Sequence, residues 1–287
     1  MPSSRSIIII VFASLLSFCK KDPKLFTTEN LNNNTISVYG HAGMGIGFQY
    51  PIDTYESVEP CLRIGADGTE LDVQLTKDSV LVVFHHQKLE DGTLCNGIIN
   101  EKYWTEIKGC NLASPISSKV NLLTFDELLN RLRDDNFDLK KYTFTFDCKL
   151  YTIQSDLKKF REQFARAILN CISKNELEER ILIESSDTSF IRVLKTLQPS
   201  LKLFIYPSSY SEGLAIAKKM DLFGITIHND YVSAEQIKEA HENGLRITLW
   251  GINSDENNLN AIYKSPDYIQ TDRIIHLLKV FDKYKEK

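Results

Sequence analysis

Residues 68–86, GTELDVQLTKDSVLVVFHH, combine alternating carboxylates with a pair of histidines in one short stretch. Side chains of a strand alternate between its faces, so Glu70 and Asp72 share one face while Leu71 and Val73 take the other. Neighbouring carboxylates are typical ligands of a hard divalent cation. Imidazole groups titrate near neutral pH and can carry protons. The stretch therefore predicts acid–base chemistry beside a bound cation.

Other polar residues stand where further predicted strands end. His41 ends the run SVYGH, and Asp147 and Lys149 end the run YTFTFDCK. The turn TKDS lets VLVVFHH fold back as a hairpin arm, which returns His85 to the same edge. Taken singly, a strand carboxylate is more often a salt-bridge partner, and a lone histidine a core residue. Together they predict an oxygen-rich cation site of three carboxylates flanked by two histidines.

These side chains can meet only in a fold that brings the ends of several strands together. The pattern of the remaining sequence predicts such a fold. Eight short β-rich runs alternate with helical patterns; they span residues 37–41, 69–73, 142–149, 181–185, 202–206, 223–228, 246–252 and 267–271. Helix starts are marked by a capping box at Thr124 and Glu127 and by a capping Ser233. This order predicts an α/β fold, a (β/α)₈ TIM barrel, whose active site lies at the carboxyl ends of the strands.

The expected barrel domain covers residues 37–287. Residues 87–120 fit no βα unit, so we expect a small insertion there, after the second strand and its hairpin. The chain has 287 residues, 43% of them hydrophobic, which is enough for a sizeable core. Its net charge is −4, with both signs spread along the chain, so no basic footprint for nucleic acid is present.

The N-terminus has the pattern of an export signal. Residues 1–19 carry a basic Arg5 and then an apolar run too short to span a bilayer, and residues 20–36 read as a linker. The sequence LLSFC resembles a bacterial lipoprotein signal with Cys19 as the lipidated residue, although Phe18 stands where a small residue is usual. We expect an exported lipoprotein, anchored to the membrane in the periplasm or at the cell surface; the alternative is a plain secretory signal.

Export changes the interpretation of the remaining cysteines. Cys95 and Cys110 flank a polar segment of the insertion and are predicted to pair in an oxidising compartment, the alternative being two free thiols. Cys61, Cys148 and Cys171 lie on apolar faces of predicted elements, so we expect inert packing residues.

The motifs resemble those of the glycerophosphodiester phosphodiesterases, which share a barrel with phosphatidylinositol-specific phospholipase C. The family pattern HRG, PENT, GADG-x-E-x-D-V, TKDG and VVFHD has its counterpart in HAG (41–43), PIDT (51–54) and GADGTELDVQLTKDSVLVVFHH (65–86). FDCK (146–149), WGIN (250–253) and YIQTD (268–272) extend the likeness over residues 37–274.

The resemblance implies a role for each matching residue. Glu70, Asp72 and Asp147 would bind a divalent cation, Ca²⁺ or Mg²⁺. His41 and His85 would act as general acid and base. Further along the motifs, Lys149 would contact the substrate phosphate and Trp250 would wall the pocket for the alcohol. The implied reaction is metal-dependent hydrolysis of glycerophosphodiesters to an alcohol and glycerol 3-phosphate.

Three departures from the family pattern keep alternatives open. Ala42 replaces the Arg of HRG, a bidentate phosphate partner. Ile52 and Asp53 replace the Glu and Asn of PENT, and His86 replaces the Asp of HD. One alternative is a phospholipase-type lyase of the same barrel, which releases the alcohol through a cyclic phosphate. The other is a non-catalytic barrel that binds a lipid or headgroup.

Overall fold

The computed structural model describes residues 27–47, 49–113 and 120–286. The expected signal, with its lipidation site at Cys19, lies outside these ranges. Within them, every helix is too short or too polar to cross a lipid bilayer.

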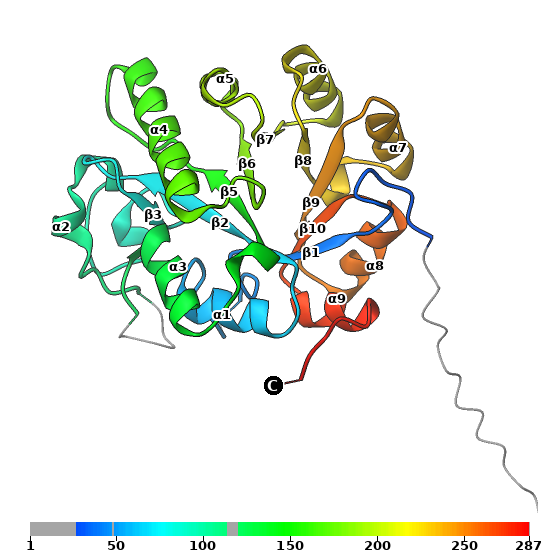
Figure 1. The fold of residues 1–287 in the computed structure, drawn as a ribbon, viewed down its shortest axis with the longest axis horizontal. Coiled ribbons are helices and arrows are strands. Elements are labelled where there is room, and N and C mark those ends of the chain that lie inside the picture. Colours follow the sequence, from blue (N-terminus) through cyan, green and yellow to red (C-terminus); the bar gives the residue numbers. More distant parts are fainter. Residues whose placement is uncertain (1–26, 48, 114–119, 287) are drawn as a thin grey trace, which may run out of the picture.

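Eight parallel strands form a closed barrel, which confirms the predicted (β/α)₈ fold (Figure 1). The pairing of β1 with β2 closes the ring at Tyr39–Gly68 and Gly40–Thr69. The barrel strands are β1 (Ser37–Gly40), β2 (Gly68–Leu75), β5 (Thr143–Cys148), β6 (Ile181–Ser185), β7 (Lys202–Ile205), β8 (Gly224–His228), β9 (Arg246–Ile252) and β10 (Tyr268–Thr271).

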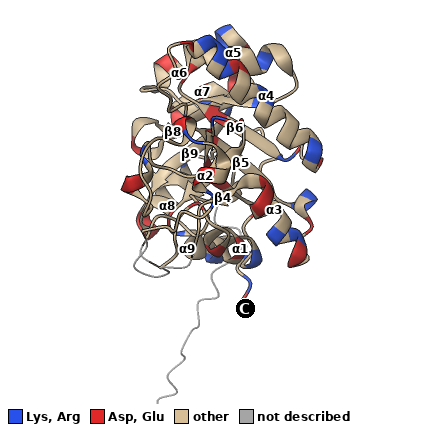
Figure 2. Ribbon diagram, turned by 90° about the vertical axis from the view of Figure 1, so that its left-hand side faces the viewer, with Lys and Arg blue, Asp and Glu red and all other residues tan. Residues whose placement is uncertain are grey.

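Helices surround the barrel, one after each strand unit (Figure 1). They are α1 (Tyr55–Arg63), α3 (Phe125–Asp134), α4 (Leu157–Asn175), α5 (Thr188–Leu197), α6 (Tyr210–Met220), α7 (Ala234–Glu242), α8 (Asp255–Tyr263) and α9 (Ile274–Val280). Thr124 and Glu127 form the predicted capping box of α3, and Ser233 caps α7. These caps satisfy N–H groups that a helix leaves unpaired at its start, which fixes where each helix begins. Acidic and basic residues are interspersed along these outer helices (Figure 2).

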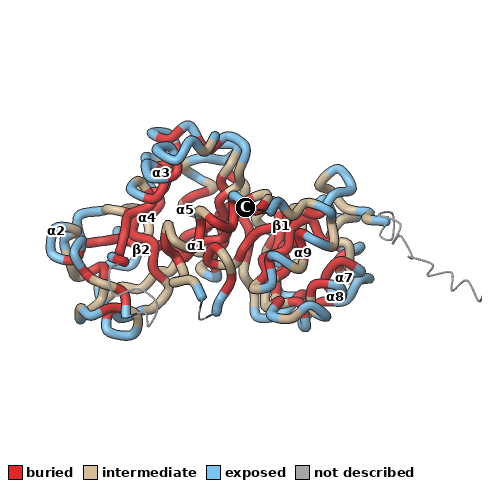
Figure 3. Tube along the Cα trace, turned by 90° about the horizontal axis from the view of Figure 1, so that it is seen from below, coloured by how far each residue is buried: buried red, intermediate tan, exposed pale blue. Residues whose placement is uncertain are grey.

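Strand alternation separates two cores. Phe144 and Phe146 of β5 point outward, and their rings lie 5.6 and 4.7 Å from that of Phe125 in α3. In Figure 3 the buried residues, drawn in red, lie along the strands and along the helices that pack on them. Inside the barrel, a smaller cluster of Tyr39, Leu182, Phe204 and Tyr268 fills the lumen. The side chains nearer the carboxyl ends of the strands, among them Glu70, Thr145, Glu184 and Gln270, are polar and buried.

The predicted insertion, residues 87–120, forms a lobe beside β2. Its described part contains the short helix α2 (Trp104–Ile107) and the 3-10 turns η1 (Leu89–Asp91) and η2 (Ile99–Glu101). It is flanked by β3 (Leu81–Val83) and β4 (Leu123–Thr124), which pair antiparallel with each other, and β3 also pairs antiparallel with β2. A disulfide joins Cys95 to Cys110, as the sequence predicts. The other cysteines among the described residues, Cys61, Cys148 and Cys171, are buried free thiols, also as predicted.

The last part of the predicted linker is bound to the barrel. The Leu31 N–H donates to Asp267 Oδ1 at 2.9 Å, and the Asn30 side chain donates to the Pro266 carbonyl at 2.7 Å. Asp267 is fully buried. Contacts with the barrel therefore include residues before the expected domain boundary at residue 37, because Asp267 offers a buried acceptor to this segment.

Candidate active site

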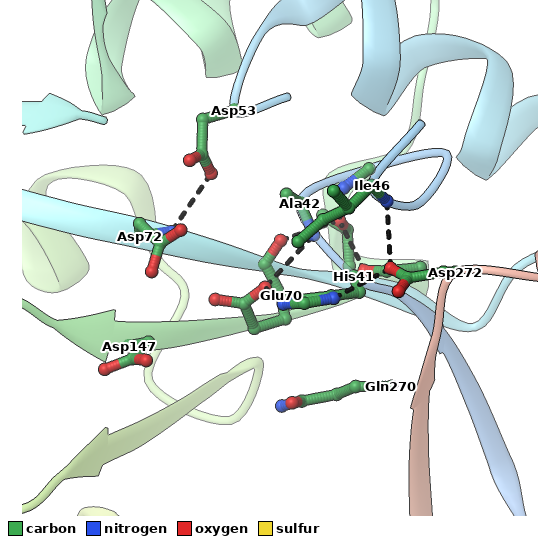
Figure 4. Close-up of polar contacts among 12 residues, drawn as sticks. His41, Ala42, Ile46, Asp53, Glu70, Asp72, Asp147, Gln270 and Asp272 are labelled. Carbon is green, nitrogen blue, oxygen red and sulfur yellow. Dashed lines mark hydrogen bonds and ion pairs between the residues drawn. The ribbon is translucent and has the colours of Figure 1, made fainter. Parts of the chain in front are cut away.

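The three predicted metal ligands meet inside the barrel. Glu70 and Asp72 come from β2, and Asp147 comes from β5 at the register position paired with Asp72. One oxygen of each carboxylate lies within 4.8 Å of the others. Glu70 and Asp72 are both 2% exposed. Strand alternation turns all three side chains into the lumen, where Figure 4 shows them grouped.

Such a cluster is electrostatically costly. Burial, and then the charge of Asp72, raise the pKa of Glu70 to about 8. Burial also raises the pKa of Asp147, against the opposing effect of Lys149. Buried carboxylates that crowd one another are normally relieved by a proton or a cation. The oxygen-only donor set fits a hard divalent cation such as Ca²⁺ or Mg²⁺.

Lys149 lies beside this cluster. Its Nζ is 2.9 Å from Asp72 Oδ1 and 2.7 Å from Asp147 Oδ2. Burial alone would lower the pKa of Lys149, but Asp147 and Asp72 outweigh it and raise that pKa. The ammonium group is therefore a fixed positive charge at the wall of the site, next to where the sequence resemblance places a substrate phosphate.

His41 follows β1 and lies on one side of the carboxylates. Its Nδ1 is 2.8 Å from Asp272 Oδ1, and its Nε2 is 3.8 Å from Glu70 Oε2 (Figure 4). Burial would lower the pKa of His41, but the hydrogen bond with Asp272 and the charge of Glu70 raise it to about 9. His41 is thus held as a proton donor, with Nε2 toward the cluster.

His85 reaches the site on the hairpin arm, as predicted. The Phe84 N–H donates to the Asp72 carbonyl at 2.9 Å, which continues the β2–β3 pairing up to this residue. The Gln74 amide holds the arm by donating to the carbonyls of Phe84 and His86. Burial lowers the pKa of His85, with Asp72 opposing. The neutral imidazole is therefore suited to accept a proton, the opposite of His41.

A cavity of about 220 Å³ joins these groups. It is lined by His41, Glu70, Asp72, His85, Asp147, Lys149 and Trp250, with Tyr206 and Glu184 across the lumen. His86 is absent from this lining and faces a neighbouring cavity. All seven catalytic, metal and substrate residues predicted from the sequence thus border one space.

Trp250 occupies its place in the wall because of the residue that follows it. Gly251 has a φ of 74°, and a Cβ there would lie 2.2 Å from His228 Nε2. The indole packs edge-on against His228 and Tyr206, with ring centroids 4.8 and 5.3 Å away. A glycine is therefore required for the turn of backbone that brings the indole to the cavity.

Three acidic residues at the site were given no role by the sequence analysis, although Asp53 and Asp272 lie in the quoted PIDT and YIQTD motifs. Asp272, which orients His41, also accepts the Ile46 N–H at 2.8 Å. Asp53 is buried and accepts the Asp72 N–H at 3.1 Å. Glu184, at the end of β6, accepts the Gln270 amide at 2.5 Å. The available signal was position, since each stands in a loop or strand end at the carboxyl edge of the barrel.

The departures from the family motifs lie around this centre. Ala42 is 1% exposed and lines neither cavity; its N–H donates to Glu70 Oε2 at 3.0 Å. The backbone at this position therefore supports a metal ligand, whatever its side chain. Ile52 contributes to the wall of the neighbouring cavity, together with His86.

Comparison with known proteins agrees with this architecture. The model of the glycerophosphoryl diester phosphodiesterase family matches residues 45–276. A glycerophosphodiester phosphodiesterase of Caldanaerobacter subterraneus is 25% identical, over 77% of this chain and 88% of that protein. One from Bacillus altitudinis is also 25% identical, over 85% and 98% of the two chains.

Solved structures show the same fold. A glycerophosphodiester phosphodiesterase from Parabacteroides distasonis superposes with a TM-score of 0.71 at 22% identity, covering 86% of this chain and 97% of that one. An Oleispira antarctica phosphodiesterase in complex with the product sn-glycerol-3-phosphate has a TM-score of 0.73 at 18% identity, with 86% and 96% covered. The chain belongs to the glycerophosphoryl diester phosphodiesterase family of enzymes.

Proposed function

We propose that this protein hydrolyses glycerophosphodiesters to an alcohol and glycerol 3-phosphate in a metal-dependent reaction. One observation carries the proposal: three clustered carboxylates and two histidines of opposite proton affinity border a single cavity. Acid–base pairs are recognised by environments that push two pKa values apart.

Glu70, Asp72 and Asp147 would hold the cation, Ca²⁺ or Mg²⁺. When bound, the cation would polarise the phosphoryl oxygens of the substrate. Lys149, already protonated between two of the carboxylates, would add a point charge for the phosphate. Trp250 would line the part of the cavity that receives the alcohol.

The histidines divide the proton transfers. His85 would take a proton from the attacking oxygen, because burial keeps its imidazole neutral. His41 would donate a proton to the departing alkoxide, since Asp272 holds it in the charged form with Nε2 toward the carboxylates. Hydrolysis needs both transfers, which explains why the cavity has a histidine on each side.

Product analysis tests this proposal against its alternatives. The purified protein is incubated with a panel of glycerophosphodiesters, with and without Ca²⁺ or Mg²⁺, and the products are followed by phosphorus NMR. Glycerol 3-phosphate formed only with metal supports the hydrolase. A cyclic phosphate as the end product would establish the lyase. Metal binding without turnover on any substrate would establish the non-catalytic barrel.

We also propose that the protein is exported and held at a membrane by lipid on Cys19. The LLSFC sequence supports this, and so does the Cys95–Cys110 disulfide, a bond that persists in oxidising compartments. In the native host, Cys19→Ser should move the protein from the membrane fraction to the soluble one. Continued membrane association would point to another anchor.

A further inference from the structure

A second cavity, of about 380 Å³, adjoins the catalytic one. The two share Ile46 and His85 as lining residues. Ile46 and His85 thus stand at the border between the carboxylate cluster and the second space, next to where a phosphate bound at the carboxylates would lie. Its size is within the range of roughly 300–1,000 Å³ that is usual for small-molecule sites.

The walls of the second cavity are mostly apolar and come from separate parts of the chain. The loop before α1 supplies Ile52, the hairpin arm supplies Phe84, and the insertion supplies Leu112 and Ala113. The described lining contains no Lys or Arg, so none of its described residues offers a permanent positive charge to a second phosphate. The polar side chains of its lining are Tyr50, Asp53, His85, His86 and Asp91. Asp91 is exposed, and Asp53 accepts the Asp72 N–H through Oδ1 while its Oδ2 is buried without a partner among the described atoms. This composition favours a hydrocarbon group over a sugar or an anion.

The insertion is fixed against the hairpin arm. A Cβ on Gly92 would lie 2.7 Å from His86 Cδ2 and 2.9 Å from Phe84 Cε2, so the backbone touches both rings. The Ala113 N–H donates to the Gly92 carbonyl at 2.9 Å, and the nearby disulfide restrains the same lobe. The cavity is therefore built before any ligand arrives, which lowers the entropy cost of binding.

We propose that this cavity binds an uncharged alkyl group carried by the phosphodiester substrate, next to the phosphate in the catalytic cavity. This inference rests on the proposed function and narrows its substrate class to glycerophosphodiesters with an apolar substituent. Each methylene of the alkyl chain that is buried in the cavity would strengthen binding. A short or strongly polar substituent would leave the apolar walls exposed to water.

A matched series of diesters tests the inference: glycerol 3-phosphate esterified with ethanol, butanol or octanol, assayed with Ca²⁺ or Mg²⁺. We expect kcat/KM to rise at least ~10-fold from the ethyl to the octyl ester, a gain of about 1.4 kcal/mol. Ile52→Asp places a charge in the wall and should bring the octyl-to-ethyl ratio close to one. Ile153→Asp is the matched control, since Ile153 is 66% exposed and lines neither cavity, and it should keep the wild-type ratio.

A second variant covers the case in which Ile52→Asp fails to fold. Ala113→Trp adds bulk at the exposed edge of the cavity without burying a charge, and it should lower the same ratio. Thermal unfolding followed by circular dichroism checks that each variant is folded.

Failure of the inference is distinguishable from failure of the proposed function. Hydrolysis of the ethyl ester with an octyl-to-ethyl ratio near one would overturn the inference alone. A preference for glycerophosphocholine over the butyl ester would also overturn it, because the cavity would then select a cation. If no diester is hydrolysed, calorimetric titration with the octyl and ethyl esters decides: at least ~10-fold tighter binding of octyl supports the cavity assignment, and equal affinities refute it.

Discussion

Both ends of the barrel hold carboxylates, but those at the amino end bind N–H groups, a lysine and a histidine, whereas three at the carboxyl end crowd one another. Asp267 accepts the N–H groups of Leu31 and Ile247 and lies 2.9 Å from His241 Nε2. Asp67 accepts the Val38 N–H and pairs with Lys283 at 2.7 Å. These groups tie loops, strands and the C-terminal segment together.

At the carboxyl end, the acids crowd one another instead. Glu70, Asp72 and Asp147 share one cavity and one ammonium group, and the pKa of Glu70 rises to about 8 through burial and the nearby Asp72. Asp53 Oδ2 is buried without a partner among the described atoms. The difference is typical of TIM barrels, where one end supplies stability and the other chemistry. The acids at the amino end join separate segments of the chain, whereas the crowded acids at the carboxyl end share a single ammonium group and border a cavity.

The largest effect should come from the metal site. Asp72→Asn together with Asp147→Asn removes two of the three predicted ligands, so turnover should fall at least ~1,000-fold, about 4 kcal/mol. Metal affinity, measured by calorimetric titration, should be lost with it. Because Lys149 loses both carboxylate partners, circular dichroism should confirm that the variant is folded before affinities are compared. Unchanged metal affinity would contradict the assignment.

At the opposite end, Asp267→Ala should cost stability and spare chemistry. The substitution leaves His241 and two buried N–H groups without their acceptor, so we expect a loss of about 3 kcal/mol in urea unfolding. Glu179→Ala, which breaks an exposed pair with Lys202, is the control and should cost less than about 1 kcal/mol. The folded Asp267→Ala protein should keep wild-type kcat; a large loss of kcat would erase the distinction between the two ends.

Removal of either proposed catalytic histidine should have a smaller effect than loss of the proposed metal ligands. His41→Ala and His85→Ala should each lower kcat by ~100-fold, about 2.7 kcal/mol, since each removes one positioned proton carrier. His86→Ala is the control and should cost much less, because His86 does not line the catalytic cavity. A larger loss from His86→Ala than from His85→Ala would mean that the wrong histidine has been assigned.

The smallest effect concerns Asp272, which acts through His41 as a positioning residue. The rate should rise with pH through a pKa of His85 below its usual value and fall as His41 loses its proton near pH 9. Asp272→Asn removes the negative partner of His41 and lowers its pKa, so the falling limb should move to lower pH. At neutral pH the loss should be ~10-fold, about 1.4 kcal/mol.

The pH profile of kcat/KM also separates this role from a structural one. A fall in thermal stability with both limbs of the profile unmoved would show that Asp272 only supports the loop that carries Ile46.

The sequence alone determined the barrel and most of its chemistry. Alternation along a strand is local, so the inward direction of Glu70, Asp72 and Asp147 follows from the order of residues. Helix caps are also local, which is why α3 and α7 begin where the sequence predicts. The short spacing between Asp72 and His85 likewise predicted a hairpin that returns His85 to the carboxyl end of the barrel.

Only the tertiary structure decided which of these side chains meet across the barrel. Asp272 and His41 are 231 residues apart and come together because β1 pairs with β10. The contact of Lys149 with Asp72 depends on the register of β5 against β2. The apolar cavity needs the insertion to pack on the hairpin arm. Alternation predicts the face a side chain takes but not its partner across the lumen, because that partner depends on how the strands pair and where the ring closes.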